Sequence, residues 1–215
     1  MGSRWEMERK KDPYYRRAKS EDYRSRASYK LKQLNKRFKI IKEGNTVVDL
    51  GAAPGGWSQV ALEKIGEEGV VVGVDLNRIK PFPEGNFYGI RGDFTKDIVQ
   101  EKVMELTNGK VDVLMSDASP SLSGVKSIDH LRSIDLINAV LDIADNILKN
   151  DGNLVIKAFQ GPEYKTILDD IKKRFRKVKS TKPPSSRNRS SEMYIVALGF
   201  KRPRKPAKME NKDLE

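Results

Sequence analysis

Short apolar runs alternate with longer amphipathic segments along most of the chain. The apolar runs predict seven strands, at residues 46–51, 70–76, 87–93, 111–117, 152–159, 178–182 and 192–200. The amphipathic segments have helical periodicity and predict helices at residues 57–66, 96–107, 128–149 and 162–176. Continuous apolar strands that alternate with helices are typical of parallel β-α-β units. The pattern therefore predicts an α/β fold with a doubly wound, mostly parallel sheet.

The end of the pattern departs from a purely parallel sheet. The strand at 192–200 follows its predecessor after a short loop, 182–191, that is rich in Pro, Ser and Arg. Parallel neighbours need a crossover connection of about a dozen residues or more. We therefore expect the last strand to be antiparallel.

The most unusual residues come directly after the predicted strands. DLGAAPGGW, residues 49–57, leads from the first strand into a turn with three glycines, and Asp75, Asp93 and Asp117 follow the next three strands. A ligand of an open α/β sheet binds beyond these strand ends. The glycine spacing matches neither G-x-G-x-x-G nor a G-K-[ST] phosphate loop.

A single Asp at a strand end is usually a helix N-cap, but three in succession favour a cofactor with donors and a cation. Asp75 is placed to accept hydrogen bonds from a ribose diol, and Asp93 is placed to accept one from an adenine amino group. Asp117 would lie near a positive charge. S-adenosylmethionine carries all of these groups and is the expected cofactor.

Charge is divided unevenly along the chain. Residues 1–42 hold 15 Lys and Arg against 5 Asp and Glu, residues 43–164 hold 11 against 19, and residues 165–189 hold 10 against 2. Lys and Arg gathered in this way replace counterions along a phosphate backbone. Aromatic residues lie among the cations of residues 13–39, and such rings can stack unpaired bases. The expected partner is RNA.

Composition excludes several kinds of site. The chain has no cysteine and one histidine, His130, so disulfides, cysteine nucleophiles and multi-histidine metal sites are excluded, and we expect no metal. No apolar run approaches the ~20 residues of a membrane span, and the first residues do not resemble a secretory signal. We expect a cytoplasmic protein without a membrane partner, and we take it to be a monomer.

A set of motifs resembles one known family. The chain carries, in order, RSRASYKL from residue 24, DLGAAPGGWSQ, VDL with Asp75, GDF with Asp93, SDASP with Asp117, VIKAF with Lys157 and SSEMY with Glu192. Up to Phe200, these motifs resemble the FtsJ/RrmJ family of S-adenosylmethionine-dependent ribosomal RNA 2′-O-ribose methyltransferases. The resemblance implies a Rossmann-like class I methyltransferase fold, with seven strands and helices on both faces.

The resemblance also implies a substrate and a set of site residues. The substrate would be a uridine ribose in large-subunit ribosomal RNA, free or in the ribosomal particle. Matched motif by motif, the catalytic tetrad falls on Lys30, Asp117, Lys157 and Glu192. The cofactor contacts fall on Gly55, Trp57, Asp75, Asp93 and Asp117. The expected organisation is a basic helical RNA-binding extension at 1–42, a methyltransferase domain at 43–201 and a basic disordered tail at 202–215.

Methyl transfer to a ribose requires a positioned hydroxyl and a way to remove its proton. Lys157, at the end of an apolar strand, is the candidate for that role. An ordinary lysine is almost always protonated at neutral pH. Burial and Lys30 disfavour the charged form, whereas Asp117 and Glu192 favour it. The sequence leaves two mechanisms open: neutral Lys157 takes the proton, or cationic Lys157 steers the hydroxyl and stabilises its anion.

Other functions fit less well. Cytosine-C5 methylation requires a cysteine, and an amino-directed adenine enzyme is expected to show Asn/Asp-Pro-Pro-aromatic where this chain reads Asp117-Ala118-Ser119-Pro120. The glycine spacing disfavours a nicotinamide-dependent enzyme. Transfer RNA stays open as the substrate. A non-catalytic RNA-binding ribosome-assembly protein is the alternative of a different class, against which the complete Lys-Asp-Lys-Glu set argues.

Overall fold

The computed structural model describes residues 12–120, 126–187 and 190–201. Its centre is a seven-stranded sheet in the order β3-β2-β1-β4-β5-β7-β6. The strands are β1 Thr46–Leu50, β2 Val70–Asp75, β3 Phe87–Arg91, β4 Val111–Ser116, β5 Leu148–Phe159, β6 Phe175–Thr181 and β7 Glu192–Phe200. The helices are α2 Pro13–Ser20, α3 Ser28–Phe38, α4 Gly56–Ile65, α5 Asp97–Thr107, α6 Lys126–Ile147 and α7 Tyr164–Arg174.

The direction of the strands confirms the predicted sheet. The first five strands pair in parallel. β7 is antiparallel to both β5 and β6, as expected for the last strand. β7 lies between those two strands, so the last strand of the chain is an interior strand of the sheet.

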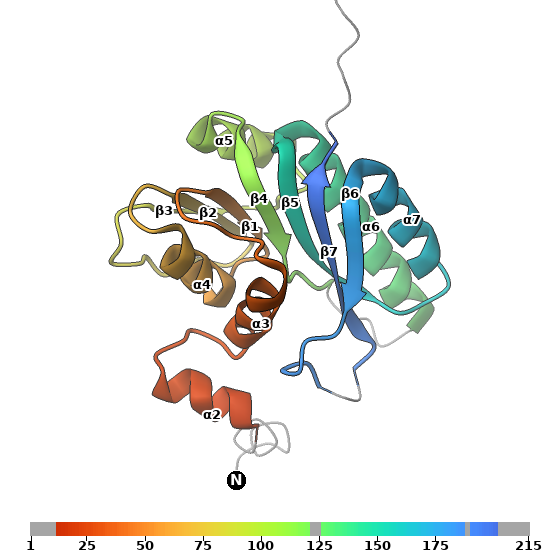
Figure 1. Ribbon diagram of the computed structural model, residues 1–215, viewed down its shortest axis with the longest axis horizontal. Coiled ribbons are helices and arrows are strands. Elements are labelled where there is room, and N and C mark those ends of the chain that lie inside the picture. Colours follow the sequence, from red (N-terminus) through yellow and green to blue (C-terminus); the bar gives the residue numbers. More distant parts are fainter. Residues whose placement is uncertain (1–11, 121–125, 188–189, 202–215) are drawn as a thin grey trace, which may run out of the picture.

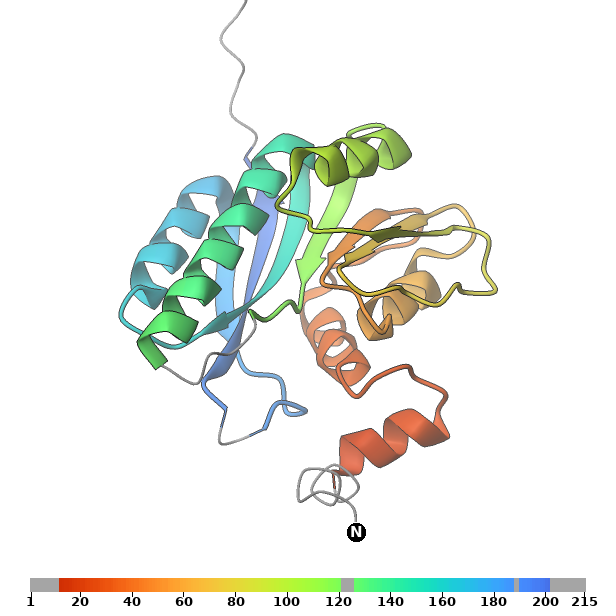
Figure 2. The same cartoon turned by 180° about the vertical axis from the view of Figure 1, so that it is seen from behind.

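Helices cover both faces of the sheet and bury two apolar clusters. α3 and α4 lie on the face seen in Figure 1, where Leu31 and Val60 pack against the strands. α5, α6 and α7 cover the opposite face, seen in Figure 2, with Val103, Leu141 and Ile171 in its cluster. α3 belongs to the predicted extension and packs directly on the domain. Within the described residues, no helix has the length and apolar character needed to cross a membrane.

Two boundaries differ from the sequence prediction. β5 begins at Leu148, directly after α6, although the polar residues 149–152 predicted a later start. A register shift between Val111 and Val113 of β4 accommodates these residues. β6 begins at Phe175, where a helix was expected to continue, because Phe175 is buried and its ring centroid lies 5.2 Å from that of Phe200.

Candidate active site

The topology gathers the carboxyl ends of five parallel strands at one edge of the sheet, the lower edge in Figure 1. Asp93 follows β3, Asp75 ends β2 and the glycine turn follows β1. Asp117 follows β4, and Lys157 lies near the end of β5. The sequence prediction that these groups share one edge is therefore confirmed by the strand order.

The glycine turn passes close to the segment after β4. Gly51 has a φ of +77°, and a Cβ there would lie 2.6 Å from the Cβ of Ala118. A side chain at Gly51 would thus push the two segments apart. It would also add backbone strain, because this positive φ favours glycine. Gly55 has a φ of +109° and is the N-cap residue of α4. The turn therefore brings backbone amides at the start of α4 to the edge of the sheet.

Asp75 and Asp93 are each held by a local turn. Asp75 accepts hydrogen bonds from the amides of Ala53, at 3.0 Å, and Asn77, at 2.8 Å. Asp93 accepts from the amide and the hydroxyl of Thr95, at 2.9 and 2.8 Å. These hydrogen bonds hold the pKa of Asp93 below its usual value. Both carboxylates are oriented in advance. Oδ1 of each already accepts two hydrogen bonds, so the lone pairs left for a further donor are on Oδ2.

The Trp57 side chain is buried inside the protein and is not placed to contact a cofactor. Its side chain is 3% exposed, and its indole Nε1 donates to the carbonyl of Ala27 at 2.9 Å. Its ring centroid lies 5.8 Å from that of Tyr194. The indole thus links α4 to the segment before α3, and a cofactor contact of Trp57 would come from its backbone.

Asp49 was not singled out by the sequence analysis, although it is a charged residue in the apolar strand β1. Its Oδ2 accepts a hydrogen bond from Ser58 at 2.7 Å, whereas its Oδ1 is buried without a partner among the described residues. Burial, aided by the negative charges of Asp117 and Asp75, raises the pKa of Asp49 to about 7. This orphaned oxygen behind the glycine turn is suited to a donor supplied by a ligand.

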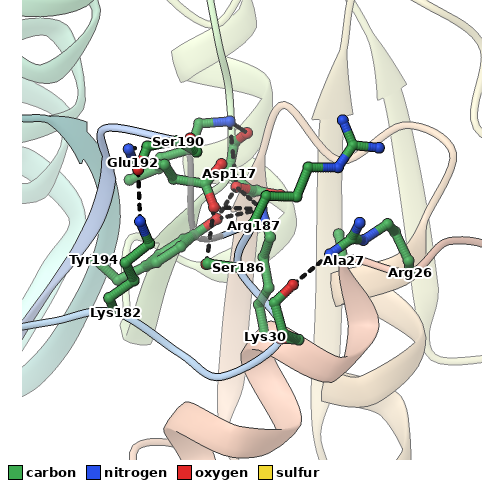
Figure 3. A network of polar contacts seen from close by, with 12 residues as sticks. Arg26, Ala27, Lys30, Asp117, Lys182, Ser186, Arg187, Ser190, Glu192 and Tyr194 are labelled. Atoms are coloured by element: carbon green, nitrogen blue, oxygen red, sulfur yellow. Dashed lines mark hydrogen bonds and ion pairs between the residues drawn. The ribbon is translucent and has the colours of Figure 1, made fainter. Parts of the chain in front are cut away.

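The four residues of the predicted tetrad come together, and Figure 3 shows three of them, Lys30, Asp117 and Glu192, around Tyr194. Lys30 Nζ lies 2.7 Å from Glu192 Oε1 and 3.9 Å from Asp117 Oδ1. Lys157 Nζ donates to the backbone carbonyl of Asp117 at 2.5 Å and lies 3.3 Å from its Oδ1. The side chains come from α3, β5, the start of β7 and the segment after β4. In the register of β5 and β7, Lys157 pairs with Tyr194, and Glu192 lies two residues before Tyr194 on β7.

The tetrad is shielded from solvent and balanced in charge. The side chains of Lys30, Asp117, Lys157 and Glu192 are 11%, 17%, 8% and 14% exposed. Burial by itself would raise the pKa of Glu192, but Lys30 and Lys157, with hydrogen bonds from Lys30 and Ser186, hold it below its usual value. Glu192 is therefore an anion at neutral pH.

Tyr194 joins the tetrad, although the sequence analysis did not assign it a role. Its fully buried hydroxyl donates to Asp117 Oδ1 at 2.6 Å and accepts from Lys30 Nζ at 2.8 Å. Burial and the charges of Asp117 and Glu192 raise its pKa far above the usual value, so the phenol stays neutral. Its position, two residues after Glu192 on one strand, was the available signal, because such residues share a face.

The basic N-terminal segment is partly engaged in internal contacts. Arg24 donates to the carbonyls of Lys80 and Pro81, both at 2.6 Å, and its guanidinium lies 3.3 Å from the centroid of the Phe82 ring. The Tyr29 ring centroid lies 5.5 Å from that of Tyr14 and 5.7 Å from that of Tyr23. These aromatic rings pack α2 and the segment after it against α3. The hydroxyl of Tyr23 donates to Glu63 of α4 at 2.6 Å, which ties this segment to the domain.

A cleft of about 500 Å³ opens onto two residues of the tetrad, Lys30 and Glu192. It is also lined by Arg26, Ala27, Arg187 and Ser190. A substrate in this cleft would meet the cations of Arg26 and Arg187 and these two members of the tetrad.

Comparison with known proteins agrees with this geometry. The family model described as FtsJ-like methyltransferase matches residues 23–200. The chain is 72% identical to ribosomal RNA large subunit methyltransferase E of Methanobrevibacter smithii, over 98% of this chain and all of that protein. It is 61% identical to the protein of the same name from Methanothermobacter thermautotrophicus, over 94% of this chain and 95% of that one.

Solved structures give the same fold. A ribosomal RNA methyltransferase from Plasmodium falciparum superposes with a TM-score of 0.74 at 31% identity, covering 83% of this chain and 98% of that one. Aeropyrum pernix fibrillarin, solved with natively bound S-adenosyl-L-methionine, has a TM-score of 0.57 at 20% identity, with 80% and 76% coverage. At that identity, the likeness to fibrillarin concerns the fold alone.

Proposed function

The chain belongs to the FtsJ-like methyltransferase family, and on this premise we propose that Lys30, Asp117, Lys157 and Glu192 carry out its reaction. The enzyme is an S-adenosylmethionine-dependent methyltransferase that modifies the 2′-hydroxyl of a uridine ribose in large-subunit ribosomal RNA. The assignment of these four residues is supported above all by one observation: two ammonium groups and two carboxylates form one connected set of ion pairs, at the edge of the sheet where a cofactor is expected.

The residues at the glycine turn fit the cofactor. Asp75 and Asp93 would accept hydrogen bonds from its ribose and adenine. The amide of Gly55 already donates to the carbonyl of Ala52, so Gly55 would contribute a turn without a side chain, and the backbone of Trp57 would offer an amide from the start of α4. Asp117 is the fifth predicted cofactor contact. The buried Asp49 oxygen without a partner supports the same reading. When bound, S-adenosylmethionine supplies a methyl group that its sulfonium already activates, so the protein has to position the hydroxyl and remove its proton.

Lys157 is the proposed proton acceptor. Its Nζ is held by both the carbonyl and the carboxylate of Asp117, so it has a fixed position at the edge. Lys30 pairs with Glu192 and lies near Asp117, so its positive charge compensates the negative charges of these two carboxylates. Burial of the tetrad keeps competing water away from the hydroxyl.

The pH dependence of the reaction separates this mechanism from the cationic one. If Lys157 accepts the proton, single-turnover rates rise with pH, because the amine must first lose its own proton. If Lys157 instead acts as a cation, single-turnover rates fall as the pH rises, because the ammonium group is then the active form. The measurement uses saturating RNA and cofactor, so that neither binding step contributes.

The function is tested by nucleoside mass spectrometry with isotopically labelled S-adenosylmethionine. Large-subunit RNA, free and in ribosomal particles, is incubated with the wild-type enzyme and digested. Label in one 2′-O-methyluridine is the expected result, and comparison of the two substrates shows which is recognised. Label in transfer RNA instead would overturn the substrate, and the absence of label from every RNA would overturn the reaction.

We also propose that the enzyme acts as a monomer in the cytoplasm, with residues 1–42 as its RNA-binding extension. All four groups of the tetrad come from one chain, which supports a monomeric enzyme. Lys30 and the cleft residue Arg26 lie in the extension, which supports its contact with RNA. The predicted tail at 202–215 lies outside the described residues. Sedimentation of the purified enzyme, alone and with RNA, tests the monomeric state.

A further inference from the structure

Two arginines stand between the catalytic cleft and a second cleft. Arg26 and Arg187 line the catalytic cleft together with Lys30 and Glu192. Both also line a neighbouring cleft of about 530 Å³ beside α2. In Figure 3 the side chains of Arg26 and Arg187 extend to the right of Lys30, whereas Glu192 and Tyr194 lie to its left. A strand of RNA that leaves the tetrad through these clefts must pass the two arginines.

One carboxylate holds both arginines. Asp12 Oδ2 forms an ion pair with Arg26 Nη1 and lies 3.9 Å from Arg187 Nε. The side chains of Asp12 and Arg26 are 11% and 20% exposed, whereas that of Arg187 is 45% exposed. Burial and the charge of Arg187 lower the pKa of Arg26 below its usual value. One negative charge therefore faces two positive ones, in a position that is partly closed to solvent.

The two oxygens of Asp12 have separate tasks. Oδ1 accepts hydrogen bonds from the amides of Tyr14 and Tyr15, at 3.0 and 3.2 Å, and so caps the N-terminus of α2. Oδ2 faces the arginines and has no part in the cap. An anionic oxygen between two guanidinium groups is the arrangement in which arginine binds phosphate.

We propose that Arg26 and Arg187 form a phosphate subsite for the nucleotide adjacent to the methylated ribose, and that Asp12 occupies it until an RNA phosphate displaces its carboxylate. This inference rests on the proposed function, because it takes the neighbouring tetrad to be the site of methyl transfer. The exchange keeps the charge constant, since one singly charged anion replaces another. Arg26 is therefore never left without a counterion.

The first test removes the arginines singly. Binding of large-subunit ribosomal RNA is measured across a salt titration for the wild type, Arg26→Gln and Arg187→Gln. Each variant is expected to bind more weakly, and its log-log salt slope is expected to be shallower by about 0.7, the value for one phosphate contact of a single strand. Arg176→Gln is the matched control, because Arg176 pairs with Asp151 at the other end of β5. Slopes equal to that of the control would overturn the subsite.

The second test removes the carboxylate that competes with RNA. Asp12→Asn keeps an oxygen able to cap α2 but loses the negative charge. Binding of the same RNA should become about threefold tighter, since an ion pair of this kind contributes a few-fold to an equilibrium. Asp151→Asn, which removes the same charge from the Asp151–Arg176 pair, should leave binding unchanged. If Asp12→Asn weakened binding, or matched the control, Asp12 would be a structural anchor and the inference would be wrong.

Failure of the subsite can be told from failure of the function. Methyl transfer by the wild type to the same RNA reports on the proposed function alone. Cofactor binding by each variant shows that it has folded. Wild-type transfer combined with unchanged salt slopes in the arginine variants would overturn only the subsite. In the expected case, Arg26→Gln raises KM for RNA and changes kcat by less than about threefold, because it touches no reacting atom.

Discussion

The proposed catalytic cluster and the proposed cofactor edge lie side by side but are built in different ways. The tetrad and Tyr194 join side chains from elements that are up to 164 residues apart, the separation of Lys30 and Tyr194. At the cofactor edge, Asp93 is bound by Thr95 and Asp75 by Asn77, two residues away in each case. The first region is set by the tertiary fold, and the second mostly by local turns.

The two regions also differ in what they leave unsatisfied. In the cluster, the charged groups have partners within the chain, and the four charges sum to zero. At the cofactor edge, a buried oxygen of Asp49 has no partner among the described residues. The difference indicates that the cluster is organised before any ligand arrives, whereas the edge would be completed by the proposed cofactor. Substitutions in the cluster should therefore affect the rate of methyl transfer, and substitutions at the edge should affect the affinity for the cofactor.

The largest effect is expected from Lys157→Ala. Loss of the proton acceptor should slow methyl transfer about a thousandfold, which is within the range for general base catalysis. Cofactor affinity should stay nearly unchanged, because Lys157 belongs to the cluster. Single-turnover transfer and calorimetric titration with S-adenosylmethionine measure the two quantities. A loss of less than tenfold, about 1.4 kcal/mol, would contradict the role of Lys157.

Asp75→Ala should have the opposite signature. It removes an acceptor for the cofactor and releases the amide of Ala53 at the glycine turn. The Kd for S-adenosylmethionine should rise about tenfold to a hundredfold, the range for loss of a charged hydrogen-bonding group. At saturating cofactor, kcat should stay close to that of the wild type. Asp151→Asn is the control for the loss of a negative charge. If kcat fell while the affinity for S-adenosylmethionine stayed unchanged, Asp75 would act in the catalytic step, and the two regions would not be separate.

A smaller effect is expected from Tyr194→Phe. The variant keeps the ring against Trp57 but loses the hydroxyl between Asp117 and Lys30. We expect kcat to fall about fivefold, which corresponds to one hydrogen bond. Cofactor and RNA affinities should not change. A loss as large as that of Lys157→Ala would instead make Tyr194 a member of the reacting set.

The smallest effect, on stability, is expected from Asp49→Asn. The folded protein binds a proton at Asp49 with a pKa of about 7, above the usual value of 3.8. Stability contributed by this group is therefore present at low pH and falls as the pH rises toward about 7. The variant has no such dependence, so its Tm relative to the wild type should increase from pH 5 to pH 8 by a few degrees. An equal Tm difference at both pH values would contradict the burial of the charge.

The sheet and the cofactor edge could be predicted from the sequence because their signals are local. Apolar runs gave the strands, and the antiparallel last strand followed from the length of one loop. The polar and glycine residues that follow each strand identified the edge of the sheet at which a ligand is expected. The start of β5 could not be predicted in this way, because polar residues 149–152 lie opposite a register shift that depends on β4.

The tetrad depended on the resemblance, because nothing local in the sequence relates Lys30 to Glu192. Tyr194 and Asp12 were missed for the same reason: their roles depend on partners that only folding brings near. Arg24 shows the reverse case. Its basic neighbourhood suggested a role in RNA binding, yet its guanidinium is engaged by the carbonyls of Lys80 and Pro81.

The interior position of β7 has a consequence for the order in which a new chain becomes active. Residues up to Asp117 contain the proposed cofactor edge, so a nascent chain carries all of it before residues 192–200 have emerged. β5 and β6 have no strand between them until residues 192–200 have emerged, and Glu192 and Tyr194 arrive with that strand. On the proposed assignment, a chain becomes competent for catalysis only once residues 192–200 have been made, and a chain terminated before them can retain the proposed cofactor edge without the proposed catalytic cluster.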